Sequence, residues 1–496
     1  MKVVFCSVPI MDFIGDMLVP IGQDLPPHAP TLAIYGLAAY LRECNYEIAV
    51  IDLVAAGTNR LDKFLPALRD ANLIAISSTS LNWATVLNVF HRIRGAEITV
   101  PIVVGGVHPT MFADYLLNAV PHLDFIIRHE GEKALLALCR ALEGNHDYSE
   151  VPNLSWRAQD GKIIHNASML PLTVEELASL PVPAYDLLPT GIFPALSVQS
   201  SRGCPFNCSF CSTSYRRSYR GIPPAAFVDT LEGVLALGAS RVLDPNLIQI
   251  VDDEWSIDRK RSIAILQEID RRGLAIKFTF DSRANDFLIN EEYTNRVAPY
   301  TARFLVGAEC GYDEGLLKIG KGTTVERLNA CARLLAKYNI AQHAEFSFIL
   351  GLPWEGKEEV LKTVRFASHL VLEYGVNVLL QWYCQIPGSE LWDESWRRGE
   401  VTPAMYDKFG FFRDLYLFKT GVKLSPDDIG EVMDVIQTTH SLIALVGRSK
   451  KTMLYSPPAA IEINFPKTFL KANESSTGAL IWNTQARERA SGGLRV

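Results

Sequence analysis

Three cysteines with short spacing lie together near the middle of the chain. Cys204, Cys208 and Cys211 form a C-x3-C-x2-C pattern within the stretch SSRGCPFNCSFC, and no further ligand follows nearby. Thiolates at such spacing can hold a metal ion or an iron–sulfur cluster within one loop. The spacing therefore predicts a metal centre to which this loop contributes three ligands and leaves one coordination position open.

Three kinds of site could use these cysteines. A structural zinc site takes four ligands, but the nearest other donors, Cys310, His165 and His343, belong to other predicted elements. A disulfide with a spare thiol suits an oxidising compartment, whereas six of the nine cysteines are scattered singly, as in reduced proteins. An iron–sulfur cluster with three thiolates keeps one iron free for a ligand. The pattern favours the cluster, with zinc and the disulfide as alternatives.

Composition and charge limit the other possible functions. The chain has 496 residues, of which 48% are hydrophobic and 21% charged, and this length predicts two or three domains. A formal net charge of −7 without a basic run argues against a nucleic-acid surface. Asp12 interrupts the N-terminal apolar stretch too early for a signal peptide, and no apolar run is long enough to span a bilayer. We therefore expect a cytoplasmic protein without a membrane span.

The first domain, residues 1–150, alternates short β-branched strands with amphipathic helices. This alternation predicts a doubly wound, Rossmann-like α/β domain with helices on both faces of a parallel sheet. Ligands of such sheets bind at the carboxyl ends of the strands. Small residues there let a large ligand approach the backbone closely. The stretch PIVVGGVHP, residues 101–109, is one of the predicted strands. The small residues at two predicted strand ends are Ser78, Thr79, Gly105 and Gly106.

The remaining chain divides into three further segments. Residues 151–192 predict a linker that contains a small hairpin and a proline-rich stretch. Residues 193–398 alternate six strands with helices, which predicts a (β/α)6 partial barrel with its chemistry at the carboxyl strand ends. The three cysteines follow the first of these strands. Residues 399–496 predict a mostly helical C-terminal region with a loose tail.

The cysteine motif, with Phe210 before its last cysteine, resembles the signature of the radical S-adenosylmethionine (SAM) superfamily. Three later stretches, GAEC, FILGLP and QIPGSEL, resemble the fourth-, fifth- and sixth-strand segments of that family in the same order. The resemblance implies a [4Fe–4S] cluster bound by the three cysteines, whose open iron chelates SAM. One electron then splits SAM, and a 5′-deoxyadenosyl radical removes a hydrogen atom from the substrate. The residues that the resemblance assigns to SAM contacts are Phe210, Arg283, Glu309 and Gly351.

The first domain refines the resemblance. The stretches GLAAYLRE, IAISSTS, IVVGGVHPT and RHEGE resemble the cobalamin-binding domain of B12-type radical SAM proteins. This resemblance implies cobalamin as a cofactor, held at the predicted strand ends, with His108 as a further contact. The D-x-H-x-x-G motif, whose histidine binds cobalt in many B12 proteins, is absent from the sequence. We therefore expect a lower corrin face without that histidine, or, as the alternative, a B12-like domain that has lost its ligand.

Taken together, the resemblances predict a cobalamin-dependent radical SAM methyltransferase. It would act on an unactivated carbon of a small molecule, with electrons from a partner such as flavodoxin or ferredoxin. The alternative is a radical SAM cyclase, dehydratase or rearrangement enzyme of the same architecture without methyl transfer. A cluster-binding sensor or electron carrier is a third hypothesis. Two further acids, Asp252 and Asp253, could orient the substrate or act as a base, or could cap the following helix.

Overall fold

The computed structural model describes residues 1–14, 17–20, 29–144, 146–213, 215–289, 291–409, 422–445 and 453–455. Its helices are α1 (Leu32–Glu43), α2 (Leu65–Arg69), α3 (Trp83–Gly95), α4 (Val107–Ala119), α5 (Glu132–Glu143), α6 (Val174–Ala178), α7 (Pro224–Gly238), α8 (Arg259–Arg272), α9 (Ala284–Ile289), α10 (Glu291–Val297), α11 (Asp313–Lys318), α12 (Val325–Lys337), α13 (Lys357–Tyr374), α14 (Glu390–Arg397) and α16 (Pro426–Leu445). In the described part of the chain, none of them is long and apolar enough to cross a membrane.

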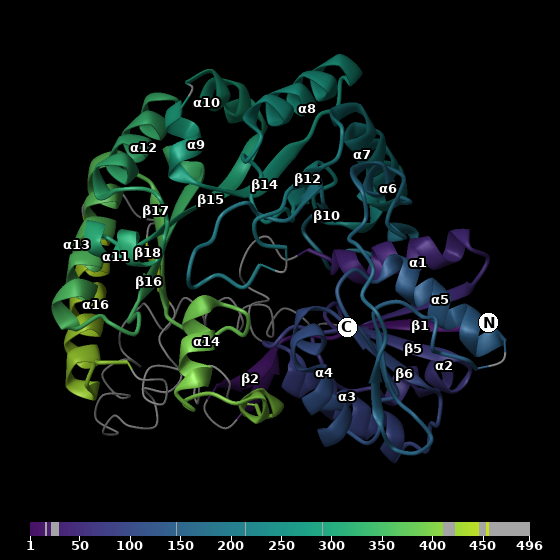
Figure 1. The fold of residues 1–496 in the computed structure, drawn as a ribbon. Coiled ribbons are helices and arrows are strands. Elements are labelled where there is room, and N and C mark those ends of the chain that lie inside the picture. Colours follow the sequence, from purple (N-terminus) through teal and green to yellow (C-terminus); the bar gives the residue numbers. More distant parts are fainter. Residues whose placement is uncertain are drawn as a thin grey trace, which may run out of the picture.

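The strands form two large sheets and two small pairs. They are β1 (Lys2–Ser7), β2 (Met11–Ile14), β3 (Met17–Pro20), β4 (Glu47–Asp52), β5 (Leu73–Ser77), β6 (Ile102–Gly105), β7 (Phe125–Ile127), β8 (Leu154–Arg157), β9 (Ile163–His165), β10 (Leu196–Val198), β11 (Ser201–Arg202), β12 (Arg220–Gly221), β13 (Leu247–Ile250), β14 (Lys277–Ser282), β15 (Thr301–Glu309), β16 (Ala344–Leu350), β17 (Asn377–Trp382) and β18 (Met453–Tyr455). Figure 1 shows the two large sheets in separate lobes of the molecule.

The first lobe is the doubly wound domain that the alternation predicts. Its parallel strands follow the order β4-β1-β5-β6-β7. Successive side chains of β1 point to opposite faces. Val3 and Phe5 enter one hydrophobic core, and Val4 and Cys6 enter another. Both faces of the sheet are therefore covered, which explains the nearly continuous apolar character of its strands.

The predicted linker contributes to this same sheet. The hairpin β8–β9 is present, as its Asp160–Gly161 turn predicts, and Gly161 has the positive φ of 84° that such a turn uses. β8 pairs antiparallel with β7 and extends the sheet to seven strands. The chain from 151 onward therefore begins as an edge of the first domain before it crosses to the second.

The second lobe is a curved parallel sheet with its helices on the convex side, as Figure 1 shows for α8, α12 and α13. The strand order is β10-β13-β14-β15-β16-β17-β18. Six of these strands match the predicted partial barrel. The seventh, β18, comes from the C-terminal region and pairs parallel with β17. The expectation of a mostly helical C-terminal region is therefore incomplete, and residues 456–496 lie outside the described part of the chain.

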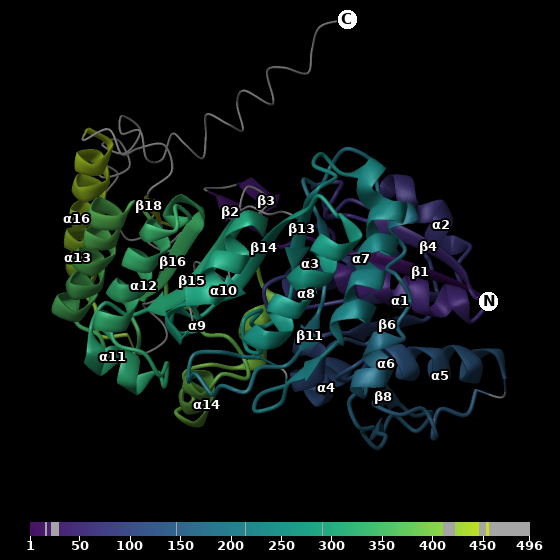
Figure 2. The same cartoon turned by 90° about the horizontal axis from the view of Figure 1, so that it is seen from above.

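The two lobes pack closely side by side, and Figures 1 and 2 show the contact from two directions. One hydrophobic core contains Val3 and Phe5 of the first sheet, Tyr185 of the connecting segment and Leu196 of the second sheet. The buried Ser197 hydroxyl donates a hydrogen bond to the carbonyl of Pro30, across the contact, at 2.8 Å. The shared core fixes how the carboxyl ends of the two sheets face each other.

A tight turn ends β6 earlier than the sequence predicts. The stretch 101–109 reads as a continuous strand, but β6 ends at Gly105 and α4 begins at Val107. Between them Gly106 has a φ of 105°, a conformation that L side chains rarely adopt. A Cβ at Gly106 would lie 2.3 Å from the carbonyl oxygen of Ser78, which is backbone and cannot easily move.

We predict that Gly106→Ala destabilises the first domain by roughly 2–4 kcal/mol, because it adds both backbone strain and a clash. The midpoint of thermal unfolding, followed by circular dichroism, should fall by several degrees. Gly105→Ala is the matched control, since its Cβ would meet the carbonyl oxygen of Ile127 at an ordinary 3.5 Å. Equal midpoints for the two variants would contradict the prediction.

Candidate active site between the two domains

The cysteine loop begins and ends at a short strand pair. β11 and β12 pair antiparallel, with Arg202 opposite Arg220, and close the base of the loop that carries the cysteines. Within the loop, Arg217 N–H donates to the carbonyl of Cys204 at 2.8 Å, and Cys211 N–H donates to that of Cys208 at 3.1 Å. All three thiols are free. The loop therefore has a backbone framework of its own.

Carboxylates at the end of β13 hold this framework. The backbone N–H and hydroxyl groups of Ser200 and Ser201 all donate to the buried Asp252. Gly203 N–H donates to Asp253 at 2.9 Å. The N-cap of α8 is Asp258, so the alternative of a helix cap is wrong for both acids. Asp252 is engaged by the loop, and a role of either acid toward the substrate stays a prediction.

A cation lies directly beside the second cysteine. The Arg283 guanidinium, from the end of β14, donates to Cys208 Sγ at 3.6 Å and stacks on the Phe206 ring at 3.8 Å from its centroid. It also donates to the backbone carbonyl of Lys321. Cys208 itself contacts the carbonyl of Gly320 at 3.9 Å. The predicted SAM-contact residue Arg283 thus adjoins the cysteine motif.

A buried ion pair completes this group. Glu309 ends β15 and accepts a hydrogen bond from Lys321 Nζ at 2.8 Å, and both side chains are less than a tenth exposed. Lys321 Nζ also lies 5.9 Å from the centroid of Phe210. The structure therefore brings Phe210, Arg283 and Glu309 together around the cysteines. Sequence reasoning missed Lys321, although Gly320 and Gly322, both at positive φ, mark its tight loop.

Gly351 lies at the end of β16, but its amide is already engaged. Its N–H donates to Glu355 Oε2 at 2.7 Å, and Leu352 N–H donates to the same oxygen at 2.9 Å. Glu355 also accepts a bond from the Tyr312 hydroxyl at 2.9 Å, and burial raises its pKa to about 7. Glu355 therefore shapes the turn after β16, and a SAM contact of Gly351 stays a prediction.

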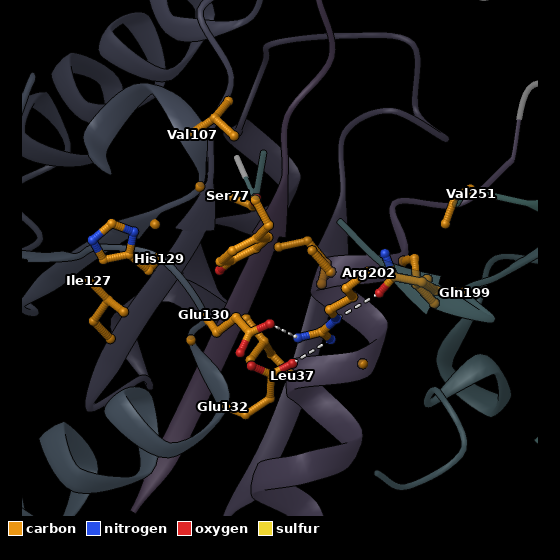
Figure 3. A pocket seen from close by; sticks show the side chains of 18 of the residues that line it. Leu37, Ser77, Val107, Ile127, His129, Glu130, Glu132, Gln199, Arg202 and Val251 are labelled. Atoms are coloured by element: carbon orange, nitrogen blue, oxygen red, sulfur yellow. Dashed lines mark hydrogen bonds and ion pairs between the residues drawn. The ribbon is translucent and has the colours of Figure 1, made fainter. Parts of the chain in front are cut away.

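A cavity of about 850 Å³ lies between the two domains. The carboxyl ends of both sheets border it, including Ser77, Ile127 and Val251, as the close-up in Figure 3 shows. The glycine pair Gly105–Gly106 borders it from the first domain. Ser212 and Thr213, which directly follow the last cysteine of the motif, border it from the second. One cavity therefore adjoins both predicted cofactor sites.

Two of the residues predicted on the first domain lie beside this cavity rather than in its wall. The buried Ser78 hydroxyl donates to Asn82 Oδ1 at 3.1 Å, and the N–H of the exposed Thr79 donates to the same oxygen at 2.8 Å. Both groups thus shape the turn after β5. Among the neighbouring residues of that strand end, Ser77 lines the cavity.

His108 is placed differently from the expectation of a loop histidine beside the cofactor. It lies in the first turn of α4, is fully buried, and is not among the residues that line the cavity. Its Nδ1 lies 2.9 Å from the Ser80 hydroxyl, and its ring stacks on Trp83 with centroids 4.9 Å apart. Burial lowers its pKa to about 3. His129, which sequence reasoning missed, lines the cavity instead.

The residues present fit the cluster and the corrinoid. The described residues include no group of His, Cys, Asp or Glu side chains that converges on one ion, but three thiolates of a cluster bind different irons and need not converge. Burial, with Glu254 and Asp253 nearby, raises the pKa of Cys204 to about 11, so ligation to iron must displace its proton. On the other side, a glycine-bordered cavity of this size suits a large planar cofactor.

Comparisons with known proteins identify both domains. A family model described as "B12 binding domain" matches residues 19–139, and one described as "Radical SAM superfamily" matches residues 198–367. The two matched segments contain the glycine pair and the three cysteines, respectively. The glycine pair therefore lies in the segment that matches a B12-binding domain, and the cysteines lie in the segment that matches the radical SAM superfamily, as the sequence predicts.

Three similar proteins extend the match beyond single domains. An uncharacterized methyltransferase of Pyrococcus horikoshii is 30% identical over 73% of this chain and 78% of its own. The anaerobic magnesium-protoporphyrin IX monomethyl ester cyclase of Rubrivivax gelatinosus is 26% identical over 84% of this chain and 74% of its own. The fold matches the structure of the cobalamin-dependent SAM radical enzyme OxsB with aqua-cobalamin and SAM bound, with a TM-score of 0.61 and 23% identity.

The OxsB match covers 74% of this chain, which spans about half (52%) of that longer protein, so this likeness concerns the fold. The two family models and the Pyrococcus horikoshii relative go further, because they match residues of both domains in the same order. The chain therefore belongs to the B12-binding radical SAM enzymes, whose cofactors are cobalamin, SAM and a [4Fe–4S] cluster.

Proposed function

We propose that the protein is a methyltransferase that methylates an unactivated carbon of a small molecule. The observation that carries this proposal is the shared cavity, because Gly105 and Gly106 border it on one side and Ser212 and Thr213 on the other. A methyl donor and a site of radical formation that face one cavity can act on the same substrate carbon without its release. The name of the Pyrococcus horikoshii relative supports the same reaction class.

When bound, the corrinoid carries the methyl group, and the cluster supplies the electron that cleaves SAM. The protein's own residues position these groups and keep water out. Arg283 places a buried charge beside Cys208, and the Glu309–Lys321 pair places charges near Phe210, where they can orient a charged cofactor. Apolar side chains such as Leu37 and Met111 line the cavity, and a cavity with such walls protects a reactive radical from solvent.

The overall reaction that we propose consumes two molecules of SAM for each methyl group transferred. One SAM loses its methyl group and leaves S-adenosylhomocysteine. The other is cleaved reductively to methionine and 5′-deoxyadenosine, which keeps the hydrogen atom taken from the substrate carbon. Two electrons are needed in each cycle, and flavodoxin or ferredoxin is the kind of partner that supplies them.

Free thiols and a cluster suit a reducing compartment, so we place the protein in the cytoplasm.

A cyclase-type reaction is the second candidate function. It is favoured by the match to the Rubrivivax gelatinosus cyclase, which extends over 84% of this chain. Such a reaction could use the same cavity and the same SAM cleavage. It would form 5′-deoxyadenosine without S-adenosylhomocysteine, so the two candidates differ in one measurable product.

We predict that the reconstituted, reduced protein with cobalamin and substrate forms S-adenosylhomocysteine and 5′-deoxyadenosine in about equal amounts. The amounts should be equal because each methylation uses one SAM as the methyl donor and one SAM as the source of the radical. Liquid chromatography with mass spectrometry measures both products from one reaction. Formation of 5′-deoxyadenosine alone would exclude methyl transfer and support the cyclase-type reaction.

We also predict that Cys204→Ala, Cys208→Ala or Cys211→Ala abolishes cluster binding, because each of the three thiolates binds a different iron of the cluster. Anaerobic reconstitution should give about four irons per chain in the parent protein and close to none in these variants. Cys44→Ala is the control, since Cys44 lies at the end of α1, far along the chain from the loop. Retention of a full cluster by any loop variant would contradict the assignment.

A further inference from the structure

The two residues that flank the cysteine loop bind the same carboxylate of the other domain. Arg202 ends β11, directly before the loop, and Arg220 begins β12, directly after it. Both guanidinium groups donate to Glu130 Oε1, at 3.1 Å from Arg202 and at 2.8 Å from Arg220. Glu130 follows β7 of the cobalamin-binding domain. One side chain of the first domain therefore holds both ends of the loop.

This contact is more than a surface ion pair. The side chain of Glu130 is 8% exposed, and those of Arg202 and Arg220 are 19% and 14% exposed. Glu132 adds a second carboxylate to Arg202 at 2.7 Å. Leu172 N–H donates to Glu130 Oε2 at 2.5 Å. Charged groups that are this well buried and hydrogen-bonded resist displacement, since separating them leaves a buried charge without its partner.

The ion cluster also forms part of the cavity wall. Glu130, Glu132 and Arg202 all line the cavity between the domains, and Figure 3 shows the two carboxylates directed at the guanidinium group. Tyr215, within the loop, lines it too, and its ring lies 4.9 Å from the Arg220 guanidinium carbon. A ligand that fills this cavity therefore contacts the groups that hold the cysteine loop.

We propose that Glu130 is a positioning residue through which the cobalamin-binding domain sets the geometry of the cysteine loop. A corrinoid in the cavity favours the arrangement in which Glu130 holds both arginines. SAM at the cluster favours the same arrangement, because its site is formed by that loop. Each ligand therefore tightens the binding of the other, and the two effects are equal by thermodynamic linkage. This inference requires both cofactors, but it does not depend on methyl transfer.

The test compares the dissociation constant of SAM with and without saturating hydroxocobalamin. The reconstituted, anaerobic protein is titrated with radiolabelled SAM without a reductant, so that SAM is not cleaved and the corrinoid stays oxidised, and binding is measured by equilibrium dialysis. In the parent protein we expect hydroxocobalamin to lower the dissociation constant of SAM about fivefold or more. The quantity compared between variants is the ratio of the dissociation constant of SAM without hydroxocobalamin to that with it. In Glu130→Gln, which keeps the shape but loses the charge, we expect this ratio to fall close to one. Iron and corrinoid per chain are measured for every sample.

Two further variants separate positioning from folding. Glu143→Gln removes another ion-paired glutamate of the first domain, which contacts the N-terminus and Tyr46 rather than the loop, and it should keep the parent ratio. Glu130→Asp keeps the charge but is one methylene shorter, so it cannot hold both arginines equally. It should lower the ratio and should serve as the test variant if Glu130→Gln does not fold.

The proposal is overturned if the parent protein shows no effect of hydroxocobalamin on SAM binding. It is equally overturned if the folded Glu130 variant keeps the parent ratio. Neither result depends on product formation, so a failure of the methyltransferase assignment would appear separately, as a reaction without S-adenosylhomocysteine. A lowered ratio with unchanged iron and corrinoid contents would support Glu130 as the link between the two cofactor sites.

Discussion

The structure depends above all on how carboxylates hold the cysteine loop. A loop that binds a cluster must keep three thiols in place before the metal arrives, and loops alone are mobile. Asp252 meets this need from within the barrel, because it accepts hydrogen bonds from both serines that precede the loop. Asp253 binds the backbone of Gly203, and Glu130 binds both flanking arginines from the other domain. The metal site is thus fixed by charges that lie outside its ligands.

The second constraint is the shared hydrophobic core of the two domains. Separate domains usually move relative to each other unless their contact is large and apolar. Here the core passes without interruption from Phe5 through Tyr185 to Leu196. The carboxyl ends of two parallel sheets consequently face one cavity, which is the edge at which such sheets bind their ligands. The packing of this shared core therefore determines what the cavity can bring together.

Features encoded by local sequence could be predicted, and features made by distant contacts could not. The strands, the hairpin at Gly161 and the cysteine loop follow from periodicity, turn residues and spacing, and the structure has them. The early start of α4 was not predicted, because the turn at Gly106 depends on its close contact with the backbone of Ser78, which is far away in sequence. The roles of Lys321 and Glu130 were not predicted for the same reason, since their partners come from other elements. Similarly, β18 has little pattern of its own and is defined by its pairing with β17.

The same reasoning indicates where substrate choice resides. The strand ends and the cysteine loop serve the cofactors, so they leave little freedom to adapt to a substrate. The loop after β17 borders the cavity from the other side: Gly388 lines it, and its Cβ position lies 3.0 Å from Met111 Sδ of the first domain. Ser389 then caps the N-terminus of α14, which packs through Trp392 against Phe112 on α4. Because this segment and Met111 border the cavity together, we expect them to limit the size of the small molecule that can enter it.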